Sequence, residues 1–165
     1  DHQPLIYIDT AGCGFEEVMH LQHRSYANHG EYFIIREHII AHAEKLLGAS
    51  IGIISPYAEQ VRYIRQEISS DATLRSMDIE VNSIDGFQGQ EKEVIYISLV
   101  RSNDASDIGF LKDERRLNVA MTRAQKKLVI VGDSATIAQH RLFSDMIAHI
   151  ELDGFYDSAW NYMGY

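Results

Sequence analysis

The sequence contains few of the residues that characterise disulfide-stabilised, membrane-spanning or strongly basic proteins. Its single cysteine, Cys13, excludes a disulfide within the chain. No apolar run approaches the roughly 18 residues of a membrane-spanning helix. Basic residues are in the minority, because 15 lysines and arginines stand against 24 aspartates and glutamates, which gives a formal net charge of −9. Since a domain that binds nucleic acid by itself is usually basic, this acidity counts against strong independent binding of DNA or RNA.

Motifs that bind nucleotide phosphates are also absent from the sequence. The chain has no Gly-x-x-x-x-Gly-Lys-Ser/Thr loop and no Gly-Lys pair. It therefore lacks the loop that surrounds the phosphates of a nucleoside triphosphate and helps to hold Mg²⁺. No apolar strand ends in the Asp-Glu pair of a Walker B site. No Gly-x-Gly-x-x-Gly follows an expected strand, which disfavours an unrelated dinucleotide-binding Rossmann domain.

The length and composition predict one globular domain. A chain of 165 residues can bury one core but is too short for two comfortable ones. The hydrophobic share of 45% and the charged share of 24% are ordinary for such a fold. Because the chain begins with Asp-His-Gln-Pro and not with Met, we expect a piece of a longer protein. No signal-peptide pattern is visible and the lone cysteine fits a reducing compartment, so we expect a cytoplasmic location and no membrane partner.

Apolar strands alternate with amphipathic helices along the chain, and this alternation predicts an α/β fold. The strands are apolar throughout, as strands covered on both faces are, so we expect a mainly parallel sheet with helices on both faces and right-handed crossovers. We expect the loops after Ile54, after Val81 and before Val94 to lie at the carboxyl edge of this sheet. The expected strands are 5–8, 51–55, 79–83, 94–100 and 128–131; the expected helices are 31–47, 58–69, one within 112–124, and 135–150. The expected irregular segments are 11–28 and 71–77, and the aromatic tail 154–165 is expected to pack on this domain or on a missing one.

Residues 112–133 are typical of a short helix, a tight turn and a buried strand. Apolar residues at positions i, i+3, i+4 and i+7 from Leu117 form one helix face. Arg116 and Arg123 are seven residues apart and would share a second stripe. A guanidinium fixed near a domain edge suits a phosphate, because its planar fork matches two oxygens. The alternative is that both arginines are solvated charges or surface ion pairs, which the local pattern alone favours.

The local charge of this segment supports a site for an anion in spite of the acidic total. Residues 112–127 carry six lysines and arginines against two carboxylates, a local charge of +4. At a cleft between domains, a local patch matters more than the net charge of the chain.

Three segments resemble conserved motifs of superfamily 1 helicases. The match to motif VI is residues 115–124, Arg-Arg-Leu-Asn-Val-Ala-Met-Thr-Arg-Ala, followed by an apolar strand ending in Gly-Asp. The match to motif V is residues 81–95, Val-Asn-Ser-Ile-Asp-Gly-Phe-Gln-Gly-Gln-Glu-Lys-Glu-Val-Ile. The match to motif IV is residues 51–60, Ile-Gly-Ile-Ile-Ser-Pro-Tyr-Ala-Glu-Gln. The chain most resembles the branch of the nonsense-mediated-decay RNA helicase and its DNA-acting relatives. The resemblance implies that residues 1–165 form the second, C-terminal RecA-like domain of the P-loop NTPase type.

The resemblance also implies a nucleotide site. Arg123 matches the arginine finger that contacts the γ-phosphate of ATP in the cleft between two RecA-like domains. Arg116, Gly89 and Glu91 are expected to join this site, with Glu91 accepting hydrogen bonds from the ribose hydroxyls. As a lone acid, Glu91 would be an ordinary surface residue. The expected cofactors are ATP and Mg²⁺ in the full-length protein, with Mg²⁺ held by the missing N-terminal RecA-like domain and no metal site in this chain.

Three other residues are expected to contact single-stranded DNA or RNA. The resemblance places Ser55, Ser83 and Gln88 near the backbone of the strand, where neutral hydrogen bonds would position it without reading its sequence. It also places Tyr57 and Gln60 beside the cleft. The alternative for the first segment is a strand end that caps the next helix, with Tyr57 as a packing residue, and the segment alone favours this alternative.

Several polar clusters have simpler interpretations. Ser25, Asn28 and Glu31 resemble the family's Ser-x-x-Asn-x-x-Glu, but we prefer to interpret Asn28 and Glu31 as a variant of the capping box. His38 and His42 have the spacing of a zinc-protease pair, but the residue after His38 is isoleucine and not the required glutamate.

One more cluster of possible metal ligands is present near the N-terminus. Cys13, His20 and His23 lack ligand-like spacing with a fourth partner. We therefore expect no metal ion there.

These observations predict the C-terminal half of an ATP-dependent helicase that moves along single-stranded DNA or RNA. This half would supply the arginine finger, the ribose contact and part of the grip on the strand. Because the Walker A and B motifs are absent, we expect the fragment to be inactive by itself, and we expect it to be monomeric. The alternative is a non-catalytic helicase-like module kept for docking.

Overall fold

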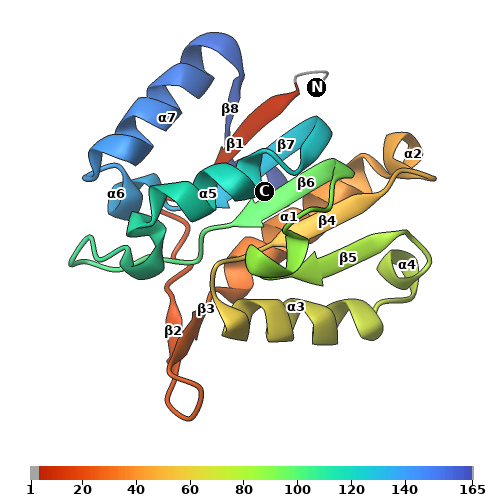
Figure 1. Ribbon diagram of the computed structural model, residues 1–165, viewed down its shortest axis with the longest axis horizontal. Coiled ribbons are helices and arrows are strands. Elements are labelled where there is room, and N and C mark those ends of the chain that lie inside the picture. Colours follow the sequence, from red (N-terminus) through yellow and green to blue (C-terminus); the bar gives the residue numbers. More distant parts are fainter. Residues whose placement is uncertain (1–3, 165) are drawn as a thin grey trace.

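Six parallel strands form the central sheet of the structure, a computed structural model that describes residues 4–164 (Figure 1). Their order across the sheet is β5-β4-β6-β7-β1-β8. The strands are β1 (Leu5–Asp9), β4 (Ile51–Ile54), β5 (Ile79–Asn82), β6 (Lys92–Ser98), β7 (Ala124–Gly132) and β8 (Phe155–Ser158). This arrangement confirms the predicted α/β fold of the RecA-like type.

Helices cover both faces of the sheet, and each strand sends alternate side chains to the two layers. In β1, Ile6 and Ile8 pack into one apolar cluster, while Tyr7 packs into the other. The first cluster lies under α1 (His29–Ala41), α2 (Ala43–Leu46), α3 (Ala58–Ser69) and α4 (Ala72–Arg75). The second lies under α5 (Glu114–Met121), α6 (Ser134–Ile137) and α7 (Arg141–Asp153). Of the helices that the structure describes, none is long and apolar enough to cross a membrane.

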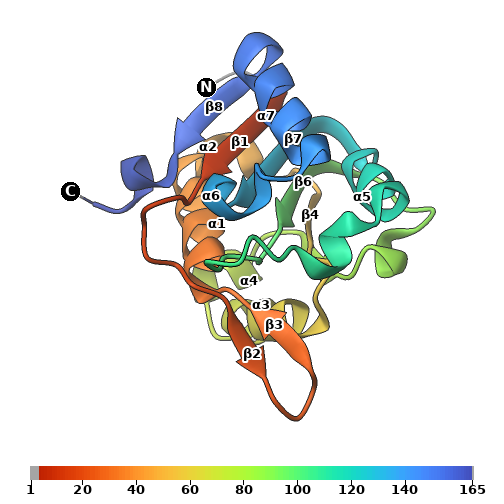
Figure 2. The same ribbon diagram turned by 90° about the vertical axis from the view of Figure 1, so that its left-hand side faces the viewer.

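A β-hairpin replaces the irregular segment that we expected at 11–28. Its strands, β2 (Val18–His20) and β3 (Ser25–Ala27), are antiparallel and project away from the sheet (Figures 1 and 2). Strands of three residues are too short for an alternating pattern to stand out in the sequence. The expected polar connection at 71–77 likewise contains a helix, α4, whose first turn is capped by the Asp71 carboxylate.

Two expected helices are interrupted in the structure. The helix expected at 31–47 divides at His42 into α1 and α2, and the one expected at 135–150 divides into α6 and α7. The C-terminal tail packs on its own domain, because β8 pairs with β1 as the edge strand of the sheet. Three short 3₁₀ turns complete the described elements: η1 (Asp85–Phe87), η2 (Gly109–Lys112) and η3 (Ala159–Tyr162).

The helix that was expected to carry both arginines ends earlier than its apolar spacing suggests. α5 ends at Met121 and β7 begins at Ala124, so Arg123 lies in the turn between them. The prediction that Arg116 and Arg123 share a helical stripe is therefore wrong. Backbone pairing of β7 with β6, beginning at Ala124 opposite Lys92, outweighs the local helical pattern.

Candidate functional site

The Arg123 guanidinium is held by three neutral oxygen atoms. Its Nε donates to the carbonyl of Val119 at 3.2 Å, Nη1 to the carbonyl of Gln90 at 3.3 Å, and Nη2 to Thr122 Oγ1 at 3.1 Å. The side chain is half-buried. Among residues 4–164, no carboxylate forms an ion pair with it. Its charge is thus oriented by the protein but left open to an external anion.

Glu91 lies beside Arg123 because of the register between β6 and β7. Lys92 pairs with Ala124, and the amide of Lys92 donates to the carbonyl of Arg123 at 3.0 Å. Glu91 and Arg123 each come one residue before this pair. The exposed Glu91 carboxylate accepts from Gln125 Nε2 at 3.3 Å. The structure therefore brings the predicted ribose and phosphate contacts together.

The loop between β5 and β6 runs from the carboxyl ends of the strands to their amino ends. It begins at Ser83, after the carboxyl end of β5, and reaches the amino end of β6 at Glu91. The expectation that the loop before Val94 lies at the carboxyl edge is therefore wrong, since a parallel connection must cross the sheet. Phe87 is fully buried and anchors the middle of the loop.

Two glycines give this loop its shape. Gly89 has a φ of +77°, in the left-handed region that favours glycine. At Gly86 a Cβ atom would lie 2.1 Å from Cγ of Asn82, so any side chain there would clash. Gly89 thus positions the backbone of Gln90 and Glu91.

Arg116 contacts the first part of the same loop. Its Nη2 donates to Asp85 Oδ2 at 3.1 Å, while its Nε is buried without a partner among the described residues. Gln88 lies beside it in a small recess that Arg115 also lines. Arg116 and Arg123 therefore both contact this loop, although they do not lie on one helical face.

Ser55 and Ser83 end neighbouring strands at the carboxyl edge. The amide of Ser55 donates to the carbonyl of Asn82 at 3.3 Å. Ser55 is 1% exposed and its hydroxyl accepts from the amide of Tyr57 at 3.3 Å, which fits the alternative role of a strand-end cap. Ser83 is half-buried, and its hydroxyl accepts from the amide of Gly86. Ser83 opens on a groove of about 480 Å³ whose other lining residues are Ala58, Val61, Arg62, Arg65, Gln66 and Asn82.

Tyr57 and Gln60 are both buried and make structural contacts within this domain. Gln60 is fully buried and joins α3 to the sheet: its Nε2 donates to the carbonyl of Asn28 and to Ser98 Oγ. The Tyr57 hydroxyl donates to the carbonyl of Ile108 at 3.2 Å. The interpretation of Tyr57 as a packing residue is confirmed.

Asn28 and Glu31 form a buried polar network that the sequence predicted only in part. Asn28 Oδ1 accepts from the amide of Glu31 at 3.2 Å, which confirms the helix cap. The Glu31 carboxylate does not complete the capping box; it accepts from Ser98 Oγ at 2.8 Å and from the amide of Val100 at 2.9 Å. Burial raises the pKa of Glu31 to about 8. Val100 has a φ of +74°, so this network holds a strained turn after β6.

His38 is a buried core residue, which the sequence did not predict. It is 1% exposed and its Nδ1 lies 2.7 Å from the Tyr96 hydroxyl. Burial lowers the pKa of His38 to about 3, so the ring is neutral at physiological pH. Its ring stacks on that of His42, with the ring centroids 4.2 Å apart.

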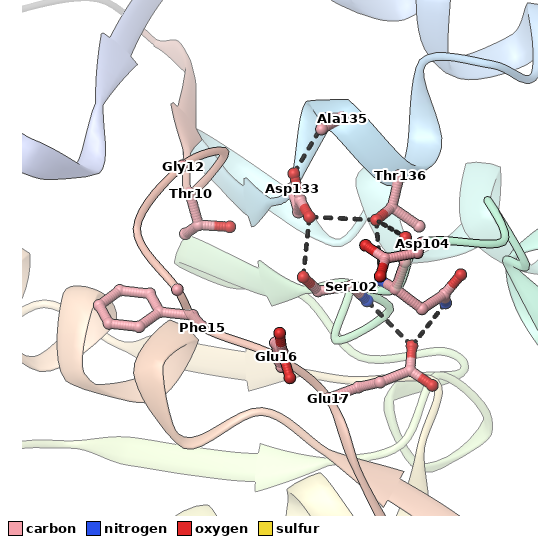
Figure 3. Close-up of a pocket in the computed structure, with 12 residues that line it drawn as sticks. Thr10, Gly12, Phe15, Glu16, Glu17, Ser102, Asp104, Asp133, Ala135 and Thr136 are labelled. Atoms are coloured by element: carbon pink, nitrogen blue, oxygen red, sulfur yellow. Dashed lines mark hydrogen bonds between the residues drawn. The ribbon is translucent and has the colours of Figure 1, made fainter.

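A second recess of about 480 Å³ lies at the carboxyl ends of β1 and β7, away from Arg123 (Figure 3). Its carboxylates are engaged by the protein: Asp133 accepts from Ser102 and Thr136, and Glu17 accepts from the amide of Ser102. Glu16 and Asp104 add further negative charge at its rim. An acidic lining repels phosphate, so the charge of this recess disfavours binding of a nucleotide.

The chain shares its sequence with known helicases over most of its length. A family model described as an AAA domain matches residues 1–135. The chain is 37% identical to DNA-binding protein SMUBP-2 of Rattus norvegicus over 161 residues, which are 97% of this chain and 16% of that protein. It is 47% identical to DNA polymerase alpha-associated DNA helicase A of Saccharomyces cerevisiae over 133 residues, 79% of this chain and 19% of that protein. It is 43% identical to a Neurospora crassa homolog of regulator of nonsense transcripts 1 over 106 residues, 62% of this chain and 10% of that protein.

The chain thus spans less than a fifth of the length of these relatives. The residues that the family model matches, 1–135, include all three of the helicase-like motifs, and the parallel sheet is of the RecA-like type. On these grounds the chain belongs to the superfamily 1 helicases, in the C-terminal region of the nonsense-mediated-decay branch.

Proposed function

We propose that this chain is the C-terminal half of an ATP-driven motor on single-stranded nucleic acid, and that Arg123 completes the ATP pocket of a first RecA-like domain. The proposal depends on the surroundings of the Arg123 guanidinium. Three neutral oxygen atoms orient it, and no carboxylate among the described residues neutralises its charge. Such a group gains a strong partner when a phosphate approaches. Glu91 lies beside it for the ribose hydroxyls.

The residues of this chain would supply charge stabilisation and positioning. ATP would draw the two domains together because Arg123 gains the γ-phosphate as a partner, and hydrolysis would remove that partner. The phosphate cradle and Mg²⁺ would come from the first domain. An arginine finger typically accelerates hydrolysis by about 10³-fold to 10⁵-fold, which corresponds to about 4 to 7 kcal/mol of activation free energy.

The loop from Ser83 to Glu91 offers a route from hydrolysis to movement. Ser83 would contact the sugar-phosphate backbone at the carboxyl ends of the strands, and Gln88 would contact it from further along the loop. Its last residues contact Arg123 through the Gln90 carbonyl, at 3.3 Å. A shift of Arg123 when the γ-phosphate leaves would therefore reach the strand through one short segment. Contacts with backbone oxygens do not depend on base identity, so DNA and RNA both fit this role.

The test is Arg123→Ala in the full-length protein, with ATPase measured at saturating nucleic acid. We expect a loss of at least about 10³-fold. Lys126→Ala is the matched control, since Lys126 is a nearby exposed cation that pairs with Glu93 at 3.7 Å. A loss of less than about tenfold in Arg123→Ala would overturn the finger and favour the docking module instead.

A further inference from the structure

The hairpin tip and the first turn of α3 bring three possible metal ligands together. His20, His23 and Glu59 each offer one ligand atom, and these atoms lie within 4.8 Å of one another. His23 Nδ1 lies 2.8 Å from Glu59 Oε2. The sequence suggested no metal site here because Glu59 is 36 residues away from His23 and reaches it only through the fold.

Two imidazole nitrogens and one carboxylate oxygen form a donor set that suits Zn²⁺, with water as the fourth ligand. Bonds of about 2.0 to 2.2 Å in a tetrahedral site place the donor atoms roughly 3.3 Å apart. The separations in the structure, 2.8 Å for one pair and at most 4.8 Å for the others, lie on either side of that value. We propose that His20, His23 and Glu59 form a Zn²⁺ site that ties the tip of the β2–β3 hairpin to α3.

The three ligands differ in mobility in a way that favours binding. Glu59 is 6% exposed, and its amide donates to Ser25 Oγ at 3.2 Å, so the first residue of β3 already positions it. The His23 side chain is 50% exposed. The His20 and His23 rings stack with centroids 4.3 Å apart and must turn to point their nitrogens at one ion. The buried carboxylate is thus fixed while the accessible rings can adjust.

The Glu59 carboxylate is shared between Arg62 and His23. Arg62 donates to both carboxylate oxygens, most closely to Oε1. Oε2 faces His23 Nδ1, and Zn²⁺ would take the place of the proton that now joins these two atoms. Arg62 remains as the second-shell partner that ligating carboxylates usually have.

The hairpin has few other attachments at its tip. Within residues 4–164, the His23–Glu59 contact is the one hydrogen bond that joins the turn at 21–24 to a residue outside the hairpin, and Ser25 next to the turn accepts from the amide of Glu59. The base is better held, since the Arg101 guanidinium lies 4.1 Å from the centre of the Tyr26 ring. A two-stranded hairpin is marginally stable by itself. Zn²⁺ would thus fix the direction of a projecting element that exposes Val18, Met19 and Leu21.

The experiment is a titration of the untagged, chelator-dialysed chain with ZnCl₂ by calorimetry, repeated with Co²⁺ as a spectroscopic probe of coordination. We expect one ion per chain with a Kd in the micromolar range or tighter, and a Co²⁺ spectrum of tetrahedral type. His20→Ala, His23→Ala and Glu59→Gln should each weaken binding by at least about tenfold. His149→Ala is the control, because His149 is an exposed histidine with a carboxylate neighbour, Asp153, at 3.4 Å.

Hydrogen exchange of the amides at 18–27 provides a second readout. We expect zinc to slow this exchange in the unmodified chain and in His149→Ala, but not in His20→Ala. His20→Ala keeps the test valid if Glu59→Gln fails to fold, since His20 accepts only one long hydrogen bond, 3.4 Å from the amide of His23. The proposal is overturned if the chain binds no zinc at about 100 µM, if the ligand variants bind like the control, or if bound zinc leaves exchange at 18–27 unchanged.

Discussion

Glu91 and Arg123 stand side by side because each precedes one member of the first residue pair between β6 and β7. Lys92 pairs with Ala124, and the backbone bond from Lys92 to the Arg123 carbonyl is 3.0 Å long. A carboxylate and a guanidinium at adjacent strand starts can therefore serve two parts of one nucleotide without forming a salt bridge with each other. The register of the sheet, and not a shared helix, sets their spacing.

Replacing Glu91 should affect recognition of the ribose more than the chemical step. In the full-length protein, we expect Glu91→Ala to raise the KM for ATP by about tenfold to 100-fold, since hydrogen bonds to a charged group contribute about 1.5 to 3 kcal/mol. The unmodified protein should prefer ATP to 2′-deoxy-ATP, and the variant should lose this preference. Glu93→Ala is the control, because Glu93 is a nearby acid that pairs with Lys126. If Glu91→Ala and the unmodified protein prefer ATP to 2′-deoxy-ATP equally, Glu91 does not contact the ribose.

Replacing Gly89 should damage activity beyond its effect on stability. Alanine in a left-handed conformation costs about 1 to 2 kcal/mol, and Gly89 has a φ of +77° with no atom near the position of an added Cβ. Gly12 has the same φ and equally open surroundings, but it lies after β1 at the other edge of the sheet. We expect Gly89→Ala and Gly12→Ala to lower the free energy of unfolding, measured in urea, by similar amounts. Only Gly89→Ala should reduce the ATPase activity. Unchanged ATPase in Gly89→Ala would mean that the loop shape is not needed.

Glu31 should make the domain less stable as pH rises. Burial raises its pKa to about 8 in the folded chain, whereas an unfolded glutamate titrates near pH 4.3. The folded state therefore binds the proton more tightly, so the stability is fully present below the unfolded pKa and is lost as pH rises to about 8. Between about pH 7 and 8 we expect the free energy of unfolding, measured in urea, to fall by up to roughly 1.4 kcal/mol. Glu31→Gln, which retains an oxygen acceptor for Ser98 and Val100, should abolish this slope, and an unchanged slope would contradict the assignment.

His38 should make the domain less stable as pH falls. Burial lowers its pKa to about 3, so the unfolded state, with a pKa near 6.5, binds the proton more tightly. Stability from this group is lost as pH falls below about 6.5, and it offsets the gain from Glu31 in the same range. His38→Gln should therefore become more stable relative to the unmodified chain between about pH 6.5 and 5. His149→Gln, at an exposed position, should show no such change, and a parallel response of the two variants would contradict the prediction.

Local patterns in the sequence were sufficient for the main elements of the fold. Apolar runs rich in β-branched residues predicted β1, β4, β6 and β7, because a strand buried on both faces needs such residues. The edge strand β5, Ile-Glu-Val-Asn, was also predicted, although only Val81 within it is buried. The same patterns failed at the hairpin, whose strands have three residues each, and at the end of α5. At both places, pairing with a distant segment decides the conformation. The helical spacing through Ala124 could not compete with its place opposite Lys92.

The sequence by itself determined the parallel α/β architecture, the helicase-like motifs and their order, and the absence of a phosphate-binding loop, since each depends on residues close together in the chain. Only the tertiary structure decided that Arg123 points toward Gln90, that the Ser55 hydroxyl is buried, and that Glu59 meets His20 and His23. These contacts join residues that are 33 to 39 positions apart or depend on packing around one side chain. Strand order and register create them, and neither is encoded in a local pattern.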